Sequence, residues 1–141
     1  MAQVLEFVGN HPFLFSLLLI IVALMVLNEM WRWRNAQPRL APMEAVRLIN
    51  SENARVIDVR GSGEFESGHI VNARNAPQDK LDDHLKELLK RRKKPVLVYC
   101  GNGLSAPRAA TRLVEAGMER VYVLRGGLQN WQQAGLPVTR K

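Results

Sequence analysis

An apolar stretch near the N-terminus constrains the fold of this chain more than any other feature. From Phe7 to Asn28 there are 22 residues without an acidic or basic side chain, if His11 is counted as neutral. At ~1.5 Å per residue a helix of that length spans about 33 Å, which matches the hydrocarbon core of a bilayer. Trp31 and Trp33 follow, interleaved with arginines, as is typical of a headgroup interface. The sequence therefore predicts a transmembrane helix that ends near residue 30.

Two other interpretations of this stretch are a secretory signal peptide and a helix buried in a soluble core. A signal peptide has a positively charged segment before its apolar region, and no Lys or Arg occurs here before Arg32. A helix that is apolar on every face needs a large protein around it, which 141 residues cannot supply. We therefore favour a membrane span.

The distribution of charge predicts the orientation of the span. The formal net charge is +7, and all 20 Lys and Arg residues lie in residues 32–141. Because the flank richer in Lys and Arg stays in the cytoplasm, we expect a single-pass protein with its N-terminus outside. The expected organisation is an anchor in residues 1–30, a juxtamembrane linker in residues 31–41 and one cytoplasmic domain in residues 42–141.

The rest of the chain shows strands alternating with helices. Apolar β-branched runs predict strands, and apolar residues at helical spacing predict helices. The strands are expected at residues 56–59, 96–99 and 121–124, and the helices at residues 43–50, 81–92, about 106–116 and after Gly126-Gly127. Such alternation is typical of a parallel sheet covered on both faces by helices. We expect an α/β fold of this kind, preceded by the transmembrane helix.

Cys100 is the only cysteine of the chain, and it lies where a parallel sheet places its ligands. It ends a predicted strand and is followed by a glycine-rich loop and a helix. Backbone N–H groups of that loop can converge on the sulfur, and the positive end of the helix favours a thiolate. The pattern suits an anionic persulfide or a bound oxyanion, although a small buried core cysteine remains the other interpretation. A single cysteine excludes an internal disulfide and a cysteine-cluster metal site, and we expect no metal and no cofactor.

Several blocks of the sequence resemble the rhodanese homology domain. They are Asp58-Val59-Arg60, Glu64-Phe65, the run from Gly68 to Ala73 with Asn75, the strand into Cys100, Gly103, Ala109-Ala110, Leu113, Gly117, Gly126-Gly127 and Trp131. The blocks cover roughly residues 42–137, and several matches in the right order are more specific than any one. With a span ahead of the domain, the arrangement is also similar to bacterial inner-membrane proteins of the YibN type. The predicted location is therefore the cell inner membrane.

The resemblance implies a rhodanese-like fold and a sulfurtransferase. Cys100 would attack a small sulfur donor, thiosulfate or a persulfide, and pass the sulfur to a thiol acceptor or to cyanide. The implied substrate-binding loop is Gly101, Asn102, Gly103, Leu104, Ser105 and Ala106. Four further residues are assigned supporting roles: Asp58 and Arg60 as structural groups beside the site, His69 as a hydrogen bonder that fixes a turn, and Arg108. Arg108 begins the second turn of the predicted helix, where it is either a cation that partly replaces those missing at positions 101 and 105 or, as we favour, a solvated helix residue.

Two loop positions depart from the pattern of the family. Active rhodaneses often carry cations one and five residues after the cysteine, where this chain has Gly101 and Ser105. Without them, a dianion such as thiosulfate should bind more weakly. The alternative function is thus a catalytically weak or inactive rhodanese module that binds another inner-membrane protein. Phosphatase relatives need an arginine six residues after the cysteine, and Ala106 at that position argues against a phosphatase.

Residues 90–94 form a run of five basic side chains between a predicted helix and strand. The simplest interpretation is a solvated turn, and the next is contact with the anionic surface of the lipid bilayer. No aromatic residues are interleaved with the run, so we do not expect nucleic acid as a partner.

Overall fold

The protein is described by a computed structural model, which covers residue 1 and residues 9–141. The chain divides into two compact units, Met1–Ala36 and Gln37–Lys141. The start of the predicted membrane span, including Phe7 and Val8, lies outside the described residues.

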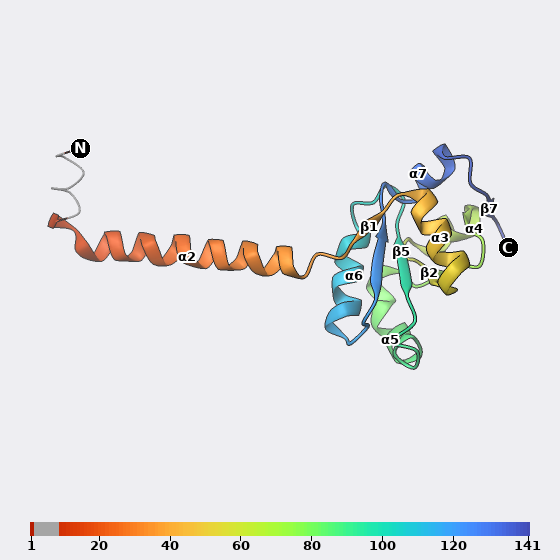
Figure 1. The fold of residues 1–141 in the computed structure, drawn as a ribbon, viewed down its shortest axis with the longest axis horizontal. Coiled ribbons are helices and arrows are strands. Elements are labelled where there is room, and N and C mark those ends of the chain that lie inside the picture. The colour runs from red at the N-terminus through yellow and green to blue at the C-terminus, as the bar shows by residue number, and fades with distance from the viewer. Residues whose placement is uncertain (2–8) are drawn as a thin grey trace. The chain divides into compact units, whose positions relative to one another are not determined.

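Helix α2, Pro12–Arg34, makes up most of the described part of the first unit (Figure 1), and residues 17–27 within it all have apolar side chains. It begins with Pro12, which fits the first helical position because the N–H that proline lacks would have no partner there. No residue of α2 is buried, and its mean hydropathy reaches 2.4. By length and composition, α2 is long and apolar enough to cross a membrane.

The helix continues through Arg34, beyond the predicted end near residue 30. Glu29 explains the extra turn, because its carboxylate accepts hydrogen bonds from Arg32 at 3.3 Å and from the Trp33 indole at 3.1 Å. Pairs three and four residues apart stabilise a helix, and they act here where the apolar pattern has already ended.

The second unit is built on a five-stranded sheet in the order β1-β6-β5-β2-β4, in which every pair is parallel (Figure 1). The strands are β1 (Arg39–Leu40), β2 (Arg55–Asp58), β4 (Arg74–Asn75), β5 (Val96–Tyr99) and β6 (Val121–Leu124). A second, antiparallel sheet pairs β3 (His69–Ile70) with β7 (Val138–Thr139). Strand β5 is buried at every position, as expected for the central strand of a sheet covered on both faces.

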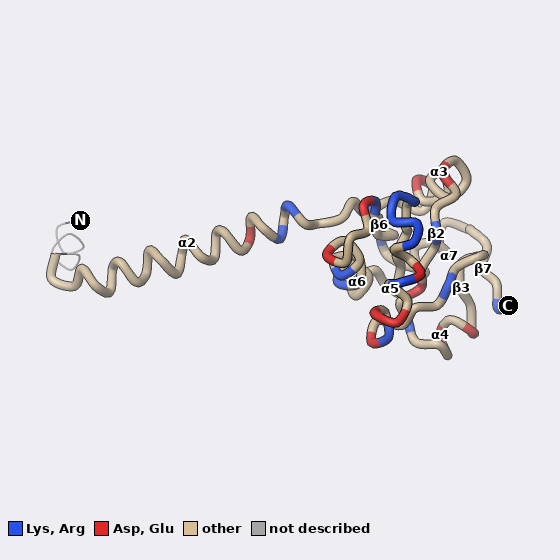
Figure 2. Tube along the Cα trace, turned by 90° about the horizontal axis from the view of Figure 1, so that it is seen from below, with Lys and Arg blue, Asp and Glu red and all other residues tan. Residues whose placement is uncertain are grey.

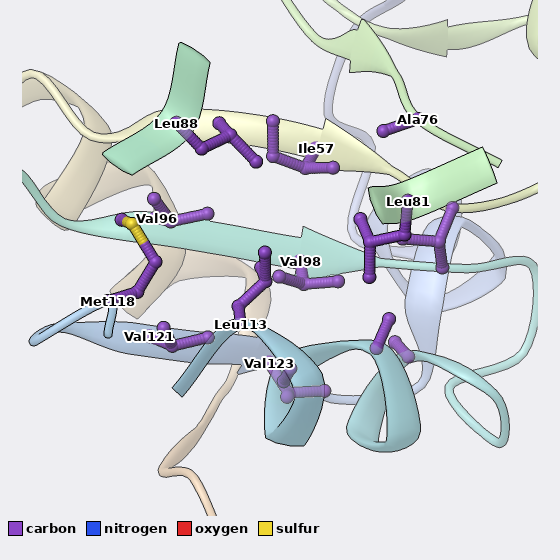
Figure 3. Packing of buried hydrophobic residues seen from close by; sticks show 14 of the residues in the cluster. Ile57, Ala76, Leu81, Leu88, Val96, Val98, Leu113, Met118, Val121 and Val123 are labelled. Atoms are coloured by element: carbon purple, nitrogen blue, oxygen red, sulfur yellow. The ribbon is translucent and has the colours of Figure 1, made fainter. Parts of the chain in front are cut away.

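Helices cover both faces of the five-stranded sheet. They are α3 (Pro42–Glu52), α5 (Leu81–Leu89), α6 (Ala106–Glu115) and α7 (Gly127–Gln133), whereas the short helices α4 (Ser62–Ser67) and η1 (Gln78–Lys80) bury no residue. Side chains of β5 alternate between the faces: Val96 and Val98 join the core under α5 and α6 (Figure 3), whereas Leu97 and Tyr99 join the core under α3 and α7. Every residue of both cores follows Gln37, so the second unit contains a hydrophobic core of its own.

The predicted α/β fold with a parallel sheet is confirmed, and the differences concern short elements. Helix α5 ends at Leu89, earlier than predicted, because the chain then turns back toward β5. Strands of two residues, such as β4, are too short to show a periodicity, so the sequence did not reveal them. Strand β1 falls within the stretch assigned to the juxtamembrane linker, yet it pairs with the edge of the sheet.

Candidate functional site

The carboxyl edge of the sheet brings the predicted site residues together. Strands β2 and β5 run parallel with Asp58 opposite Tyr99, so that the residues after both strands emerge side by side. Cys100 therefore lies next to Arg60, whose side-chain carbon Cδ is 3.8 Å from the position that a Cβ on Gly101 would occupy. Cys100 itself is only 2% exposed.

Hydrogen-bond donors surround the sulfur of Cys100. The backbone N–H of Gly103 donates to Sγ at 3.1 Å, and the backbone N–H groups of Ser105 and Ala106 and the Ser105 hydroxyl also act on it. Ser105 precedes the first turn of α6 but makes no side-chain capping bond with the helix, so its hydroxyl is available to the sulfur. Asn102 shapes the loop, because its side-chain oxygen accepts the N–H of Leu104 at 3.1 Å. This ring of donors suits an anion at Sγ.

The pKa of Cys100 reflects two opposing effects. Burial alone raises it, whereas the hydrogen bonds from the Ser105 hydroxyl and from the N–H groups of Ala106, Ser105 and Gly103 lower it. The second effect is larger, and the pKa lies below the ordinary value of a thiol. A larger fraction of Cys100 is consequently the nucleophilic thiolate near neutral pH.

Replacing Ser105 with alanine should raise the pKa of Cys100. The thiolate then loses stabilisation by the Ser105 hydroxyl, while burial continues to raise the pKa. The measurement is the rate of Cys100 alkylation by iodoacetamide as a function of pH. We expect the midpoint to move to higher pH in Ser105→Ala and to stay near that of the wild type in Ser105→Thr, which keeps the hydroxyl. An unchanged midpoint in the alanine variant would mean that the backbone donors suffice.

The start of α7, after the turn that follows β6, is hydrogen-bonded to the backbone of Cys100 and Gly101. Leu128 N–H donates to the carbonyl of Cys100 at 2.8 Å, and Gln129 N–H donates to the carbonyl of Gly101 at 3.0 Å. Gly103 adopts φ +84°, and a Cβ there would come within 2.9 Å of the backbone nitrogen of Gly126. The loop thus packs backbone against backbone on this turn, and only glycine allows so close an approach.

Asp58 and Arg60 form a buried ion pair beside the site. The carboxylate of Asp58, whose side chain is fully buried, accepts Arg60 Nη2 at 2.7 Å, Arg60 Nε at 3.1 Å and the Arg60 backbone N–H at 2.9 Å. Arg60 Nη2 also donates to the carbonyl of Gly68 at 2.6 Å, and Asn75 Nδ2 donates to the carbonyl of Arg60 at 2.9 Å. Nε and Nη2 of the guanidinium are therefore committed to internal partners.

His69 and Arg108 have no recorded contact with the sulfur. The His69 ring is buried, stacks on Phe65 at 3.7 Å between ring centroids, and is hydrogen-bonded through Nδ1 to the Phe65 carbonyl at 2.7 Å. Arg108 is exposed on α6, and no ion pair joins it to the described residues. Leu104, at the tip of the loop, is 82% exposed.

Sequence reasoning missed two features of the site. Ser105 was assigned to the substrate-binding loop and noted for lacking a positive charge, but the effect of its hydroxyl in lowering the pKa of Cys100 was not foreseen. The backbone of Leu128 and Gln129 was not connected with Cys100, although the Gly126-Gly127 pair marked a tight turn before them. Both features depend on contacts between segments that are distant in sequence.

A parallel sheet with a cysteine cradled at its carboxyl edge, between a loop and a helix N-terminus, defines the class of protein to which this chain belongs. The sequence profile of the rhodanese-like domain matches residues 41–134. The chain belongs to the rhodanese-like family, as a single-domain member.

Known relatives support this assignment. The chain is 34% identical over 142 aligned residues to the uncharacterized protein YibN of Escherichia coli strain K12, an alignment that covers 99% of both chains. It is 36% identical over 94 residues to the thiosulfate sulfurtransferase GlpE of Coxiella burnetii, covering 67% of this chain and 86% of that protein.

A solved structure of a rhodanese-related protein from Thermoplasma volcanium is similar at a TM-score of 0.66 and 28% identity, covering 74% of this chain and 99% of that one. The crystal structure of a thiosulfate sulfurtransferase from Pseudomonas aeruginosa is similar at a TM-score of 0.65 and 25% identity. That similarity covers 74% of this chain and 19% of the Pseudomonas chain.

Proposed function

We propose that this protein is a membrane-anchored sulfurtransferase that carries sulfur as a persulfide on Cys100. The observation that carries the proposal is the ring of donors at Sγ: the Gly103 N–H donates to it at 3.1 Å, and the Ser105 and Ala106 donors further lower the pKa of Cys100. Such a ring stabilises both the attacking thiolate and the anionic persulfide that replaces it. The sulfurtransferase activity of GlpE-type relatives supports the same reaction class.

The reaction consists of two displacements at sulfur. The Cys100 thiolate attacks the outer sulfur of the donor, an S–S bond forms, and the donor's own S–S bond breaks to release sulfite from thiosulfate or a thiolate from a persulfide. An acceptor thiolate or cyanide then attacks the outer sulfur of the Cys100 persulfide and takes it away, which regenerates the thiolate. No general base is needed once Cys100 is ionised, and the His69 ring is bound to Phe65 instead.

The loop around Cys100 favours a donor of low charge. Gly101 and Ser105 supply no cation, and the guanidinium of Arg60 is occupied by Asp58 and Gly68. The donors at Sγ, the Gly103 N–H and those of Ser105 and Ala106, are all neutral, and Arg108 is exposed on α6. We expect a persulfide to be the better donor and a thiol the physiological acceptor.

The proposed location is the cell inner membrane. Helix α2 supplies one span, and the arginines that follow it favour a cytoplasmic rhodanese domain with the N-terminus outside. The lipid bilayer is then the first partner of the chain.

A second candidate function is recruitment of another inner-membrane protein by a rhodanese module of little or no activity. The exposure of Leu104 beside the site favours it, because an apolar side chain at a loop tip suits a protein contact better than a small donor. In that case Cys100 would be dispensable.

The intact mass of residues 37–141 after exposure to thiosulfate, cysteine persulfide or mercaptopyruvate distinguishes the two functions. We expect a gain of one sulfur atom that dithiothreitol removes, and sulfur transfer to cyanide that falls roughly 10³-fold or more in Cys100→Ser, because the nucleophile is lost. A mass gain that persists in the Cys100→Ser control would show that sulfur binds elsewhere. No gain with any of the three donors would favour the recruitment function.

A further inference from the structure

Basic side chains gather at the amino edge of the sheet, opposite to the Cys100 edge. The basic patch comprises Arg55, Arg74, Lys90, Arg91, Arg92, Lys93, Lys94 and Arg120. Part of it is the continuous blue stretch of trace near the β2 and β6 labels in Figure 2. Its members come from the first residue of β2, the first residue of β4, the turn after α5 and the residue before β6.

Acidic residues neutralise only part of this patch. Glu87 pairs with Arg74, Glu119 with Arg92 at 3.6 Å, and Glu52 with Arg120. Lys90, Arg91, Lys93 and Lys94 form no ion pair within the described residues. The patch thus combines eight cations with three carboxylates and keeps an excess of five positive charges.

The turn that carries the four unpaired cations is held in a fixed shape. Arg55 Nη2 donates to the carbonyl of Leu88 at 2.9 Å and to the carbonyl of Arg91 at 3.2 Å. Burial, followed by the charges of Arg91 and Arg74, lowers the pKa of Arg55. Two backbone hydrogen bonds also hold the turn. The Lys94 N–H donates to the Arg91 carbonyl at 3.0 Å, and the Glu119 N–H donates to the Arg92 carbonyl at 3.1 Å. The cations are therefore displayed on an ordered support.

We propose that the basic patch binds the anionic lipid surface of the membrane that holds α2, so that the Cys100 edge of the sheet faces away from the bilayer. Strand β5 separates the two edges, because the basic turn leads into Val96 and Cys100 follows Tyr99. The proposal rests on the proposed anchoring, and it implies that sulfur acceptors reach Cys100 from the cytoplasm.

An array of lipid headgroups fits the patch better than a single small anion does. The recess among Arg55, Arg74, Lys90, Arg91 and Lys94 also contains the carboxylate of Glu87, which repels a lone phosphate. A surface that carries many phosphates can meet each exposed cation separately. Only residues 35–38 link α2 to β1, so an anchored domain stays within reach of the headgroups.

The first test uses the full chain in nanodiscs of phosphatidylcholine, with or without one third phosphatidylglycerol. Acetylation of Lys90, Lys93 and Lys94, followed by mass spectrometry, should slow roughly fivefold or more in the anionic discs and recover in high salt. Alkylation of Cys100 should proceed equally in both discs. Equal acetylation in both discs would contradict the proposal, and slower alkylation of Cys100 in the anionic discs would overturn the orientation.

The second test uses residues 37–141, the unit with its own core, in flotation with phosphatidylglycerol vesicles. Replacing Lys90, Arg91, Lys93 and Lys94 with glutamine should weaken binding on the order of several hundredfold, since each cation contributes about fivefold. The matched control replaces four exposed cations elsewhere with glutamine: Arg47, Arg125, Arg140 and Lys141. We expect the vesicle binding of this control variant to weaken less than about tenfold.

The outcomes separate the failure of the patch from the failure of the anchor. Equal losses in the two fourfold variants would show that net charge alone acts, and complete displacement by millimolar inorganic phosphate would show a small-anion site. Stronger binding of single-stranded RNA than of the vesicles would indicate nucleic acid instead. If carbonate extracts the full chain from membranes, the anchor is wrong, and flotation still decides whether the patch binds lipid.

Discussion

A Gly127→Ala substitution should destabilise the rhodanese domain by about 3 kcal/mol or more and displace Cys100. Gly127 adopts φ +62°, and a Cβ there would lie 2.4 Å from the Cys100 carbonyl oxygen and 2.8 Å from the Gly101 carbonyl. These atoms belong to the backbone and cannot rotate away. The same two carbonyls accept the N–H groups that begin α7, so relief of the clash would break those bonds. Urea unfolding of residues 37–141 measures the loss of stability, and sulfur transfer to cyanide should fall with it.

Gly135 provides a matched control for this substitution. Its φ is +74°, and no atom lies within 4 Å of the Cβ that an alanine would add. Gly135→Ala therefore meets the backbone strain alone, and we expect a loss of about 1 kcal/mol with sulfur transfer unchanged. If the two variants unfold at the same urea concentration, backbone strain alone accounts for the loss of stability in Gly127→Ala, and contact with the Cys100 loop adds nothing.

An Asp58→Ala substitution should lower the free energy of unfolding by about 3–5 kcal/mol. The Asp58 side chain is fully buried and that of Arg60 is 10% exposed, so the change leaves a positive charge without its partner in the protein interior. Arg60 also holds the Gly68 carbonyl at 2.6 Å, and its release would loosen the segment between α4 and β3. Urea unfolding of residues 37–141 again supplies the measurement.

The double variant Asp58→Ala/Arg60→Ala distinguishes a coupled pair from two independent residues. Because it removes both charges, it should cost about 1–3 kcal/mol less than the sum of the single changes. Strict additivity would mean that each side chain stabilises the domain through other contacts. Sulfur transfer measured on the same proteins would show whether the pair also positions Gly101.

The sequence predicted the sheet and its principal helices because burial on both faces leaves long apolar runs, as in β5. It also predicted Cys100 and its loop, since a strand that leads into a glycine-rich turn has a recognisable local pattern. It predicted that backbone N–H groups of the loop converge on the sulfur, as the Gly103 N–H does, but it did not predict a part for the Ser105 hydroxyl or for the turn before α7. The role of the Ser105 hydroxyl depends on side-chain direction, and the support from Leu128 depends on packing between segments far apart in the chain. Neither property has a periodicity that a sequence can show.

The sequence also revealed only part of the arrangement of the charged residues. The run at residues 90–94 was evident as a cluster of charge, but its ordered shape depends on Arg55, which lies more than thirty residues earlier. Arg74 and Arg120 lie at the start of β4 and immediately before β6, and Arg74 pairs with Ile57, the third residue of β2, so the parallel pairing of distant segments brings these cations to the same side of the sheet. The sequence therefore shows the basic run at residues 90–94, whereas the basic patch, which adds Arg55, Arg74 and Arg120, is seen only in the fold.

Strand β1 gives the segment after α2 a protective role. The carbonyls of Pro38 and Leu40 accept the N–H groups of Val123 at 2.9 Å and Arg125 at 2.8 Å. A protease that cuts before Pro38 would release a domain whose sheet edge is still covered. A cut after Leu40 would leave the β6 edge open to pair with other chains and to aggregate. The few residues that follow α2 thus decide whether a domain released by proteolysis remains soluble.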